Sequence, residues 1–281
     1  MKFLNASLTK LQVLQEQAGK LLHTSNLYHN EPAGKLAELL VELTKSYDAP
    51  SFDGAKVFFA NSGAEANEGA LKVARKAGKD RWAKATGRPS NDPSCDKHEI
   101  VCFENGFHGR SMGALSVTSN PKYQNPFEPL IPGVRVGKLN AQETIDNLIS
   151  EKTCGVIVEP IQGEGGLQSA SIDWLKALRK KCDEVGAVLI FDEIQVRRAI
   201  SFPHYRSSIG RRFCTLQCGL YRTGSLWAHS TFGQDCRPDI ITMAKPLANG
   251  YPIGAVMMRR EVAEVMSVGK PLKLAIRASR P

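Results

Sequence analysis

Short apolar runs alternate with segments of helical spacing along most of the chain, and this alternation restricts its fold more than any other feature. The runs are expected as strands at 56–60, 99–103, 154–158, 187–191, 240–243 and 254–258. Helices are predicted where apolar residues recur every three or four positions. These segments are Leu8 to Leu22, a helix from Pro32, a helix from Ala64, 141–149 and 172–185. Strands that alternate with helices favour an α/β domain whose mostly parallel sheet is covered on both faces.

Polar residues follow four of the predicted strands, at the edge where open α/β sheets bind ligands. Gly63 and Ala64 begin a helix after the first strand, and free amides there suit a phosphate group. Phe107 offers a planar ring after the second strand. Asp192 ends a run of bulky apolar residues, and Lys245 ends another. These strand ends are the candidate site.

A buried strand that ends in Asp192 is also typical of P-loop ATPases. The partner motif of those proteins requires Gly-Lys followed by Ser or Thr. Every Gly-Lys pair in this chain is followed by Leu, Asp or Pro. The sequence therefore excludes a P-loop.

The four strand ends together suit one kind of cofactor chemistry. A desolvated lysine such as Lys245 can form an imine with an aldehyde and afterwards move protons. Asp192 can keep a pyridine nitrogen protonated, which makes the ring an electron sink. Phe107 can stack on that ring, and the helix beginning at Gly63 and Ala64 can hold a phosphate. These are the requirements of pyridoxal phosphate.

Five motifs in this order resemble those of the class III pyridoxal-phosphate-dependent aminotransferases. They are Asn61–Glu68 (NSGAEANE), Phe107–Arg110 (FHGR), Glu159–Gly166 (EPIQGEGG), Asp192–Gln195 (DEIQ) and Ala244–Lys245. The resemblance covers roughly Leu11 to Gln195 and Cys218 to Val268. It implies an α/β fold, the large domain of aminotransferase fold type I, with a mostly parallel sheet flanked by helices.

The resemblance also implies roles around the cofactor. Lys245 would form the Schiff base, and Asp192 would pair with the pyridine nitrogen. Gln195 would lie beside the ring hydroxyl. Gly63 and Ala64 would bind the phosphate, and no metal is implied.

Substrate roles follow in the same way. Phe107 would stack on the cofactor ring, Arg110 would bind the substrate carboxylate, and Glu164 would line the side-chain pocket. Within the family, Leu22–Pro32, the FHGR motif and Gly166 look more like the acetylornithine branch than the ornithine or 4-aminobutyrate branches. That branch moves an amino group from N-acetylornithine to 2-oxoglutarate, giving glutamate, in arginine biosynthesis. An ornithine or 4-aminobutyrate aminotransferase and an inactive cofactor-binding fragment are the alternatives.

The chain departs from the family pattern at 196–217. These 22 residues separate DEIQ from a Cys218–Gly224 segment that follows it directly in the family, and they carry five arginines and no acid. We treat them as an insertion and hypothesise that they are a translated intron; the transcript sequence across Gln195 and Cys218 tests this. A genuine loop is the alternative.

The end of the chain departs as well. The tail 269–281 matches nothing in the family, and its four cations and the five arginines of 196–217 equal the net charge of +9. A basic surface for nucleic acid is therefore not expected. The domains expected are an abbreviated helical segment at 1–45, a cofactor domain at 46–268 interrupted by 196–217, and the tail. The family's small C-terminal domain is expected to be missing, and the chain as written is expected to be poorly soluble and weakly active or inactive.

Partners and location follow from the resemblance. The family forms homodimers, and small molecules are the expected ligands. No apolar run is long enough to span a bilayer, so no membrane partner is expected. The seven cysteines show no paired spacing, which favours a reducing compartment. Residues 1–10 hold no arginine and are not a convincing transit peptide. The mitochondrial matrix is expected from the family, and the cytoplasm is the alternative.

Overall fold

The fold is taken from a computed structural model of the chain. It describes residues 8–25, 28–164, 166–194, 225–248 and 250–266. Gln195, the insertion 196–217 and the tail from residue 269 lie outside the described residues, so the predictions made for them stay predictions.

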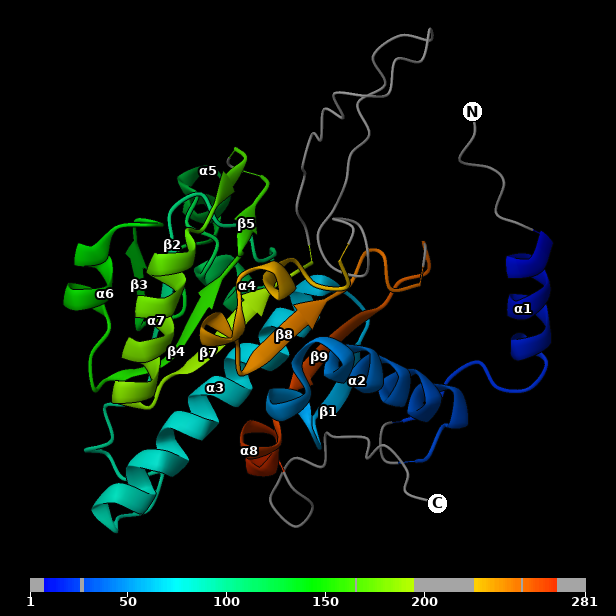
Figure 1. Cartoon of the computed structure of the whole chain (residues 1–281), viewed down its shortest axis with the longest axis horizontal. Coiled ribbons are helices and arrows are strands. Elements are labelled where there is room, and N and C mark those ends of the chain that lie inside the picture. Colours follow the sequence, from blue (N-terminus) through cyan, green and yellow to red (C-terminus); the bar gives the residue numbers. More distant parts are fainter. Residues whose placement is uncertain (1–7, 26–27, 165, 195–224, 249, 267–281) are drawn as a thin grey trace, which may run out of the picture.

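A seven-stranded sheet forms the centre of the described fold (Figure 1). Its strands lie side by side in the order β1, β9, β8, β7, β4, β2, β3. Their bounds are Lys56–Ala60 (β1), Gly254–Met258 (β9), Ile240–Met243 (β8), Val188–Asp192 (β7), Thr153–Val158 (β4), Glu99–Phe103 (β2) and Val134–Gly137 (β3). Five neighbouring strands, from β8 to β3, are parallel. The α/β fold with a mostly parallel sheet, predicted from the sequence, is therefore confirmed.

Only β9 runs against the others among the described strands of this sheet. It pairs antiparallel with both β8 and β1, so β1 points the same way as β8. The carboxyl ends of β1, β8, β7, β4 and β2 consequently meet at one edge. All residues of β4 and β7 are buried, because strands covered on both faces need apolar side chains on both.

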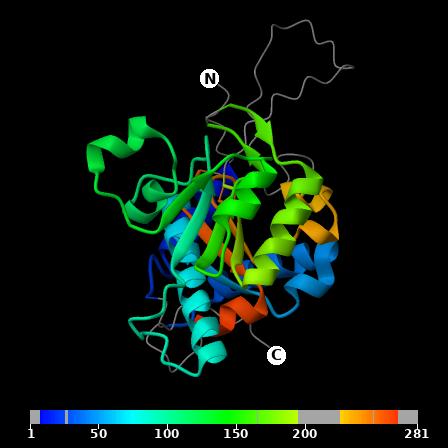
Figure 2. The same ribbon diagram turned by 90° about the vertical axis from the view of Figure 1, so that its left-hand side faces the viewer.

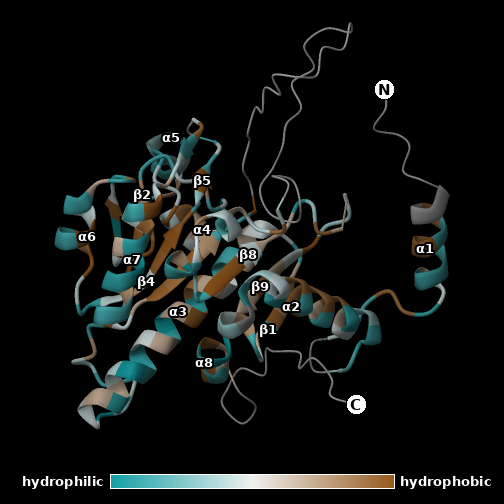
Figure 3. Cartoon of the chain, in the orientation of Figure 1, coloured by the Kyte–Doolittle hydropathy of each residue, from teal (hydrophilic) through white to brown (hydrophobic). Residues whose placement is uncertain are grey.

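Helices cover both faces of the sheet. Helix α3 (Gly63–Thr86) packs on one face with α8 (Arg260–Ala263), where small residues such as Ala70 and Ala74 allow a close approach to Ile190 and Ile240. The other face carries α2 (Glu31–Phe52), α6 (Gln142–Leu148) and α7 (Ile172–Val185), as the contents of the two remaining large cores show. Figure 2 shows α3 and α7 on opposite sides of the strands. In Figure 3, apolar residues gather in the strands between these helices.

Several short elements connect the larger ones and were not predicted. They are α4 (Met112–Ser116), α5 (Pro121–Gln124), a two-stranded hairpin of β5 (Ile161–Gln162) and β6 (Gln168–Ser169), and 3-10 turns at Asn125–Phe127, Ala228–Thr231, Gln234–Cys236 and Glu264–Met266. Strand β3 was also missed. It lies at the sheet edge and is largely half-exposed, so its sequence VRVG lacks the apolar run of a buried strand.

Helix α1 (Leu8–Ala18) is shorter than predicted, because a turn at Gly19 and Lys20 follows Ala18. Its apolar residues do not pack into a described core: Leu11 is 58% exposed. Helix α2 begins at Glu31, one residue before the predicted start, with Asn30 as its N-cap. Among the described helices, none is both long and apolar enough to cross a membrane.

Candidate functional site

The described strand ends bring residues of all five sequence motifs to one edge of the sheet. Gly63 faces the side chains that follow β7 and β8: a Cβ placed on it would lie 2.8 Å from Ile194 and 3.4 Å from the Ala244 Cβ. A Cβ on Gly109 would lie 2.7 Å from the Cβ of Ala64. The FHGR loop, the start of α3 and the residues beside Asp192 and Lys245 are therefore packed together.

Asp192 is the most strongly fixed residue of this site. Its side chain is 1% exposed, and its Oδ2 accepts hydrogen bonds from Asn67 Nδ2 at 2.8 Å and from His108 Nδ1 at 2.8 Å. Its Oδ1 accepts the backbone N–H of Ile194 at 2.9 Å and keeps further acceptor capacity. Such donors hold a buried carboxylate in one orientation.

The two donors to Asp192 are themselves held in place. Asn67 Nδ2 also donates to the carbonyl of His108 at 2.7 Å. The N–H of His108 donates to Thr118 Oγ1 at 2.9 Å, and that hydroxyl lies 3.0 Å from the carbonyl of Gly109. Asn67, His108 and Thr118 are buried and had no assigned role in the sequence reading. Asn67 follows Gly63 by one helical turn, which is the signal that could have placed it on the same face.

The start of α3 has the form of an anion-binding site. Ser62 is the N-cap and accepts the N–H of Glu65 at 3.2 Å, while Glu65 Oε2 accepts the N–H of Asn61 at 2.7 Å. The N–H groups of Gly63 and Ala64 belong to the first turn, so they have no partner within the helix. Free amides and the helix dipole together attract negative charge.

Glu159 lies directly after β4 and is a second buried carboxylate of the site. It is 2% exposed, and its Oε2 accepts the N–H of Phe107 at 3.0 Å. Burial raises the pKa of Glu159 well above its usual range, and the negative charge of Asp192 raises it further. The hydrogen bond from Phe107 and the positive charge of Lys245 oppose this shift. The groups around Glu159 thus link the ends of β2, β4, β7 and β8.

This environment makes the stability of the fold depend on pH. The raised pKa of Glu159 means that its contribution to stability is full below about pH 4.5, the ordinary carboxyl value, and is lost as the pH rises through its value in the fold. In the wild type the free energy of unfolding should fall by up to about 1.4 kcal/mol per pH unit over this range. Glu159→Gln has no titrating carboxyl at this position and should not show this fall. Urea unfolding between pH 5 and 9 measures it, with the exposed Glu104→Gln as control. Parallel pH profiles of the wild type and Glu159→Gln would contradict this account.

The remaining predicted residues border the same site. Lys245 lies just beyond β8 and is exposed, so the desolvation expected of it is not seen against the described residues. Thr242 within β8 is in register with Asp192 of β7. Phe107 is half-buried, and Arg110 is exposed with no hydrogen bond or ion pair to the described residues. Glu164 is exposed and lies near enough to Glu159 to influence its charge. Gln195 lies outside the described residues.

Glu193 follows Asp192 and fixes a neighbouring segment to the end of β7. Its role is not predicted from the sequence. It is 1% exposed and accepts three N–H groups: Ala228 N at 2.7 Å, His229 N at 3.1 Å and His229 Nδ1 at 2.6 Å. The His229 ring lies against Trp227 and the edge of Phe191. Glu193 therefore ties the segment after residue 224 to the end of β7. No local pattern in the sequence signals this pairing.

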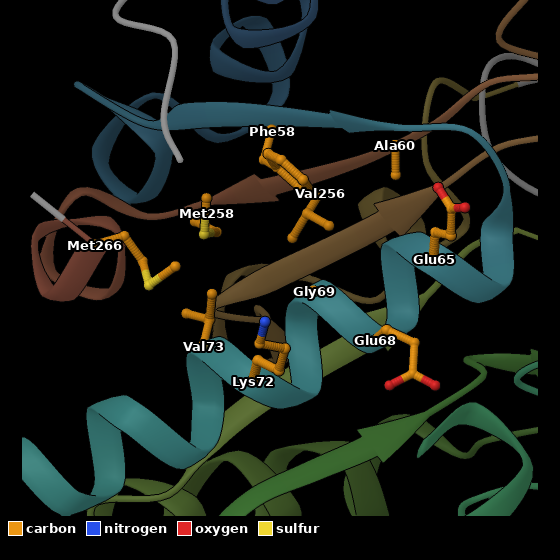
Figure 4. A pocket seen from close by; sticks show the side chains of 10 residues that line it. All are labelled: Phe58, Ala60, Glu65, Glu68, Gly69, Lys72, Val73, Val256, Met258 and Met266. Atoms are coloured by element: carbon orange, nitrogen blue, oxygen red, sulfur yellow. The ribbon is translucent and has the colours of Figure 1, made fainter. Parts of the chain in front are cut away.

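A separate cavity of about 200 Å³ lies between α3 and the strands β1 and β9 (Figure 4). Its walls include Phe58, Val73, Val256 and Met258, with Glu65, Glu68 and Lys72 on the α3 side. It faces the flank of α3 rather than the ends of the strands. It is therefore distinct from the convergence of polar residues around Asp192.

The fold and the strand-end residues agree with the comparison with known families. The sequence model of "Aminotransferase class-III" matches residues 9–197 and 215–275. The chain therefore belongs to the class III aminotransferase family, and the predicted resemblance is confirmed. The unmatched residues 198–214 lie inside the expected insertion, and the match runs on into the segment expected to lie outside the family pattern.

Curated relatives and solved structures extend this result. The chain is 52% identical to "Acetylornithine aminotransferase, mitochondrial" of Yarrowia lipolytica, over 94% of this chain and 54% of the relative. It is 48% identical to the Neurospora crassa protein of the same name, over 92% and 49%. The structure of N-acetylornithine aminotransferase from Stenotrophomonas maltophilia matches with a TM-score of 0.64 and 34% identity, over 92% of this chain and 54% of that one. The ornithine aminotransferase of Toxoplasma gondii matches with a TM-score of 0.69 and 29% identity, over 92% and 52%. The chain spans about half the length of the curated relatives it matches.

Proposed function

We propose that this chain carries the cofactor-binding part of a pyridoxal-phosphate-dependent aminotransferase that moves an amino group from N-acetylornithine to 2-oxoglutarate. The observation that carries the choice of substrate is the identity of 52% and 48% with proteins named acetylornithine aminotransferase. Glutamate is the product on the acceptor side. An ornithine aminotransferase is the second candidate, favoured by the structural likeness to the Toxoplasma gondii enzyme.

The residues at the strand ends fit pyridoxal phosphate. The N–H groups of Gly63 and Ala64 suit the phosphate, because they have no partner within the helix. Asp192 keeps acceptor capacity on Oδ1 for a ring nitrogen, while two donors fix its Oδ2. Phe107 offers the flat face for stacking. A related protein, the Toxoplasma gondii ornithine aminotransferase, has been described with PLP at its active site.

Each of these side chains would have a separate role in amino transfer. When bound, the cofactor supplies an aldehyde that bonds to amines and a ring that draws electrons from the carbon beside the nitrogen. Asp192 would keep a proton on the ring nitrogen, and the hydrogen bonds from His108 and Asn67 hold its carboxylate in one orientation. Lys245 would hold the cofactor through its amine, and the same amine would serve to move a proton between substrate atoms. Glu159 holds the backbone N–H of Phe107 and so orients the stacking ring.

Substrate binding is proposed for Arg110 and Glu164. Arg110 is exposed beside the start of α3, and its guanidinium has no partner among the described residues, which suits a substrate carboxylate. Glu164 would face the substrate side chain, and Gln195 the ring hydroxyl. A homodimer in the mitochondrial matrix completes the proposal, in keeping with relatives that are named mitochondrial.

The proposed reaction is tested with the purified 281-residue chain. Glutamate formation is measured with pyridoxal phosphate, 2-oxoglutarate and one of three donors: N-acetylornithine, ornithine or 4-aminobutyrate. We expect N-acetylornithine to be the preferred donor by at least tenfold in kcat/KM. A variant without 196–217 should turn over faster, since these residues interrupt the family motif. Preference for ornithine would overturn the substrate assignment, and a lack of transfer in both chains would favour an inactive fragment.

A further inference from the structure

Tyr123 lies between the two residues that are proposed to face the cofactor ring and the substrate. Its ring meets the ring of Phe107 edge to face, with centroids 5.8 Å apart and planes at 76°. Its hydroxyl donates a hydrogen bond to Glu164 Oε1 at 3.2 Å. One half-buried side chain thus contacts both Phe107 and Glu164.

The backbone of Tyr123 is fixed to the sheet by the short helix α5. Asn120 caps this helix by accepting the N–H of Lys122 at 3.0 Å. Gln124 Nε2 donates to the carbonyl of Leu115 in α4 at 3.1 Å. Ser119 Oγ donates to the carbonyl of Phe103, the last residue of β2, at 2.9 Å. The backbone that carries Tyr123 is therefore held to α4 and to the end of β2 on both sides of this residue.

Tyr123 also borders a small cavity beside the site. The cavity has a volume of about 170 Å³, and Phe107 and Glu164 line it together with Tyr123 and Asn105. Phe107 in turn donates its N–H to Glu159, so its backbone and its ring are held by different partners. Tyr123 is the partner of the ring.

We propose that Tyr123 is a positioning residue that fixes the Phe107 ring and the Glu164 carboxylate relative to each other, and so sets the affinity for both cofactor and amino donor. The proposal rests on the proposed function. The ring of Tyr123 acts on the cofactor through Phe107, because an aromatic edge restricts the tilt of the ring it contacts. The hydroxyl acts on the amino donor through Glu164.

Two substitutions separate the effect of the Tyr123 ring on the cofactor (the ring arm) from the effect of its hydroxyl on the amino donor (the hydroxyl arm). Tyr123→Phe keeps the ring and removes the hydroxyl, so it should raise KM for the amino donor about tenfold, change kcat less than twofold and leave the cofactor affinity unchanged. Tyr123→Leu removes both and should in addition weaken pyridoxal phosphate binding about tenfold, measured from the visible absorbance of the bound cofactor. Phe127→Leu, an exposed aromatic of the next turn, should change none of these values.

A double substitution tests whether the hydroxyl acts through Glu164. If it does, Tyr123→Phe added to Glu164→Gln should raise KM no further than Glu164→Gln alone. A normal KM in Tyr123→Phe, or additive effects in the pair, would overturn the hydroxyl arm. An unchanged cofactor affinity in Tyr123→Leu would overturn the ring arm.

A measurement without cofactor separates this proposal from the proposed function. In the cofactor-free chain, ring protons of Phe107 and Tyr123 should show a nuclear Overhauser effect in the wild type that is retained when Glu164 is replaced by Gln. Failure of the chain to bind pyridoxal phosphate, with that effect present, would refute the proposed function alone. The lack of the effect would refute the positioning role.

Discussion

Replacing Asp192 with asparagine is expected to lower the rate of amino transfer about a thousandfold, the scale of effect seen when one preorganised electrostatic group is lost from an active site. The amide oxygen of the variant can still accept the hydrogen bonds from Asn67 and His108, while its NH2 group, which cannot accept, then faces the N–H of Ile194. The negative charge that would hold the ring nitrogen protonated is lost, and the ring then draws electrons less strongly. The loss should therefore appear in kcat more than in KM.

Steady-state kinetics with N-acetylornithine and 2-oxoglutarate measure this effect. Asp235→Asn serves as the matched control, because the Asp235 side chain is 76% exposed and pairs only with Lys176 among the described residues. We expect the control to stay within twofold of the wild type. A kcat for Asp192→Asn within tenfold of the wild type would show that Asp192 does not act on the ring.

Glu193→Ala should lower the free energy of unfolding by about 3–5 kcal/mol, because it removes a buried carboxylate that accepts three hydrogen bonds. The carboxylate accepts the N–H groups of Ala228 and His229 and the Nδ1 of His229, all in a buried environment. Without it, three donors lose their acceptor, and each unsatisfied buried donor costs about 1–3 kcal/mol. The segment from Ser225 should then detach from the end of β7.

Urea unfolding at constant pH measures the loss. Glu184→Ala is the control: this side chain is 52% exposed in α7 and lies 4.0 Å from Lys181. An exposed pair of this kind contributes about 0–1 kcal/mol. A loss below about 1 kcal/mol for Glu193→Ala would contradict the supporting role given to Glu193.

The main strands and helices of the described fold could be predicted because their signals are local. Val188–Asp192 is apolar and buried throughout, and α3 carries its own cap at Ser62 and its own stop at Gly87, whose φ of 70° suits glycine. Strand β3 gave no such signal, since it lies at the edge of the sheet, is largely half-exposed and therefore has no continuous apolar run. The apolar spacing in α1 predicted a helix correctly, but the spacing alone does not say what covers Leu11 and Leu14, which are exposed.

The site divides in the same way. Asp192 and Lys245 could be proposed as site residues because strand ends and turn residues are visible in the sequence. The roles of Asn67 and His108 could not, because their bonds to Asp192 join residues 125 and 84 positions apart. Tyr123 and Glu164 meet across 41 residues through a four-residue helix with no periodicity to reveal it. Such long-range contacts follow from the assembled sheet, not from the local pattern.

We propose that Lys245 is the lysine that attaches pyridoxal phosphate. The direct test is to incubate the purified chain with pyridoxal phosphate, reduce it with sodium borohydride and identify the modified peptide by mass spectrometry, with Lys245→Ala beside it. We expect a phosphopyridoxyl group on Lys245 at near one equivalent, and no comparable site in Lys245→Ala. Modification spread over surface lysines, with Lys245 unmodified, would contradict it.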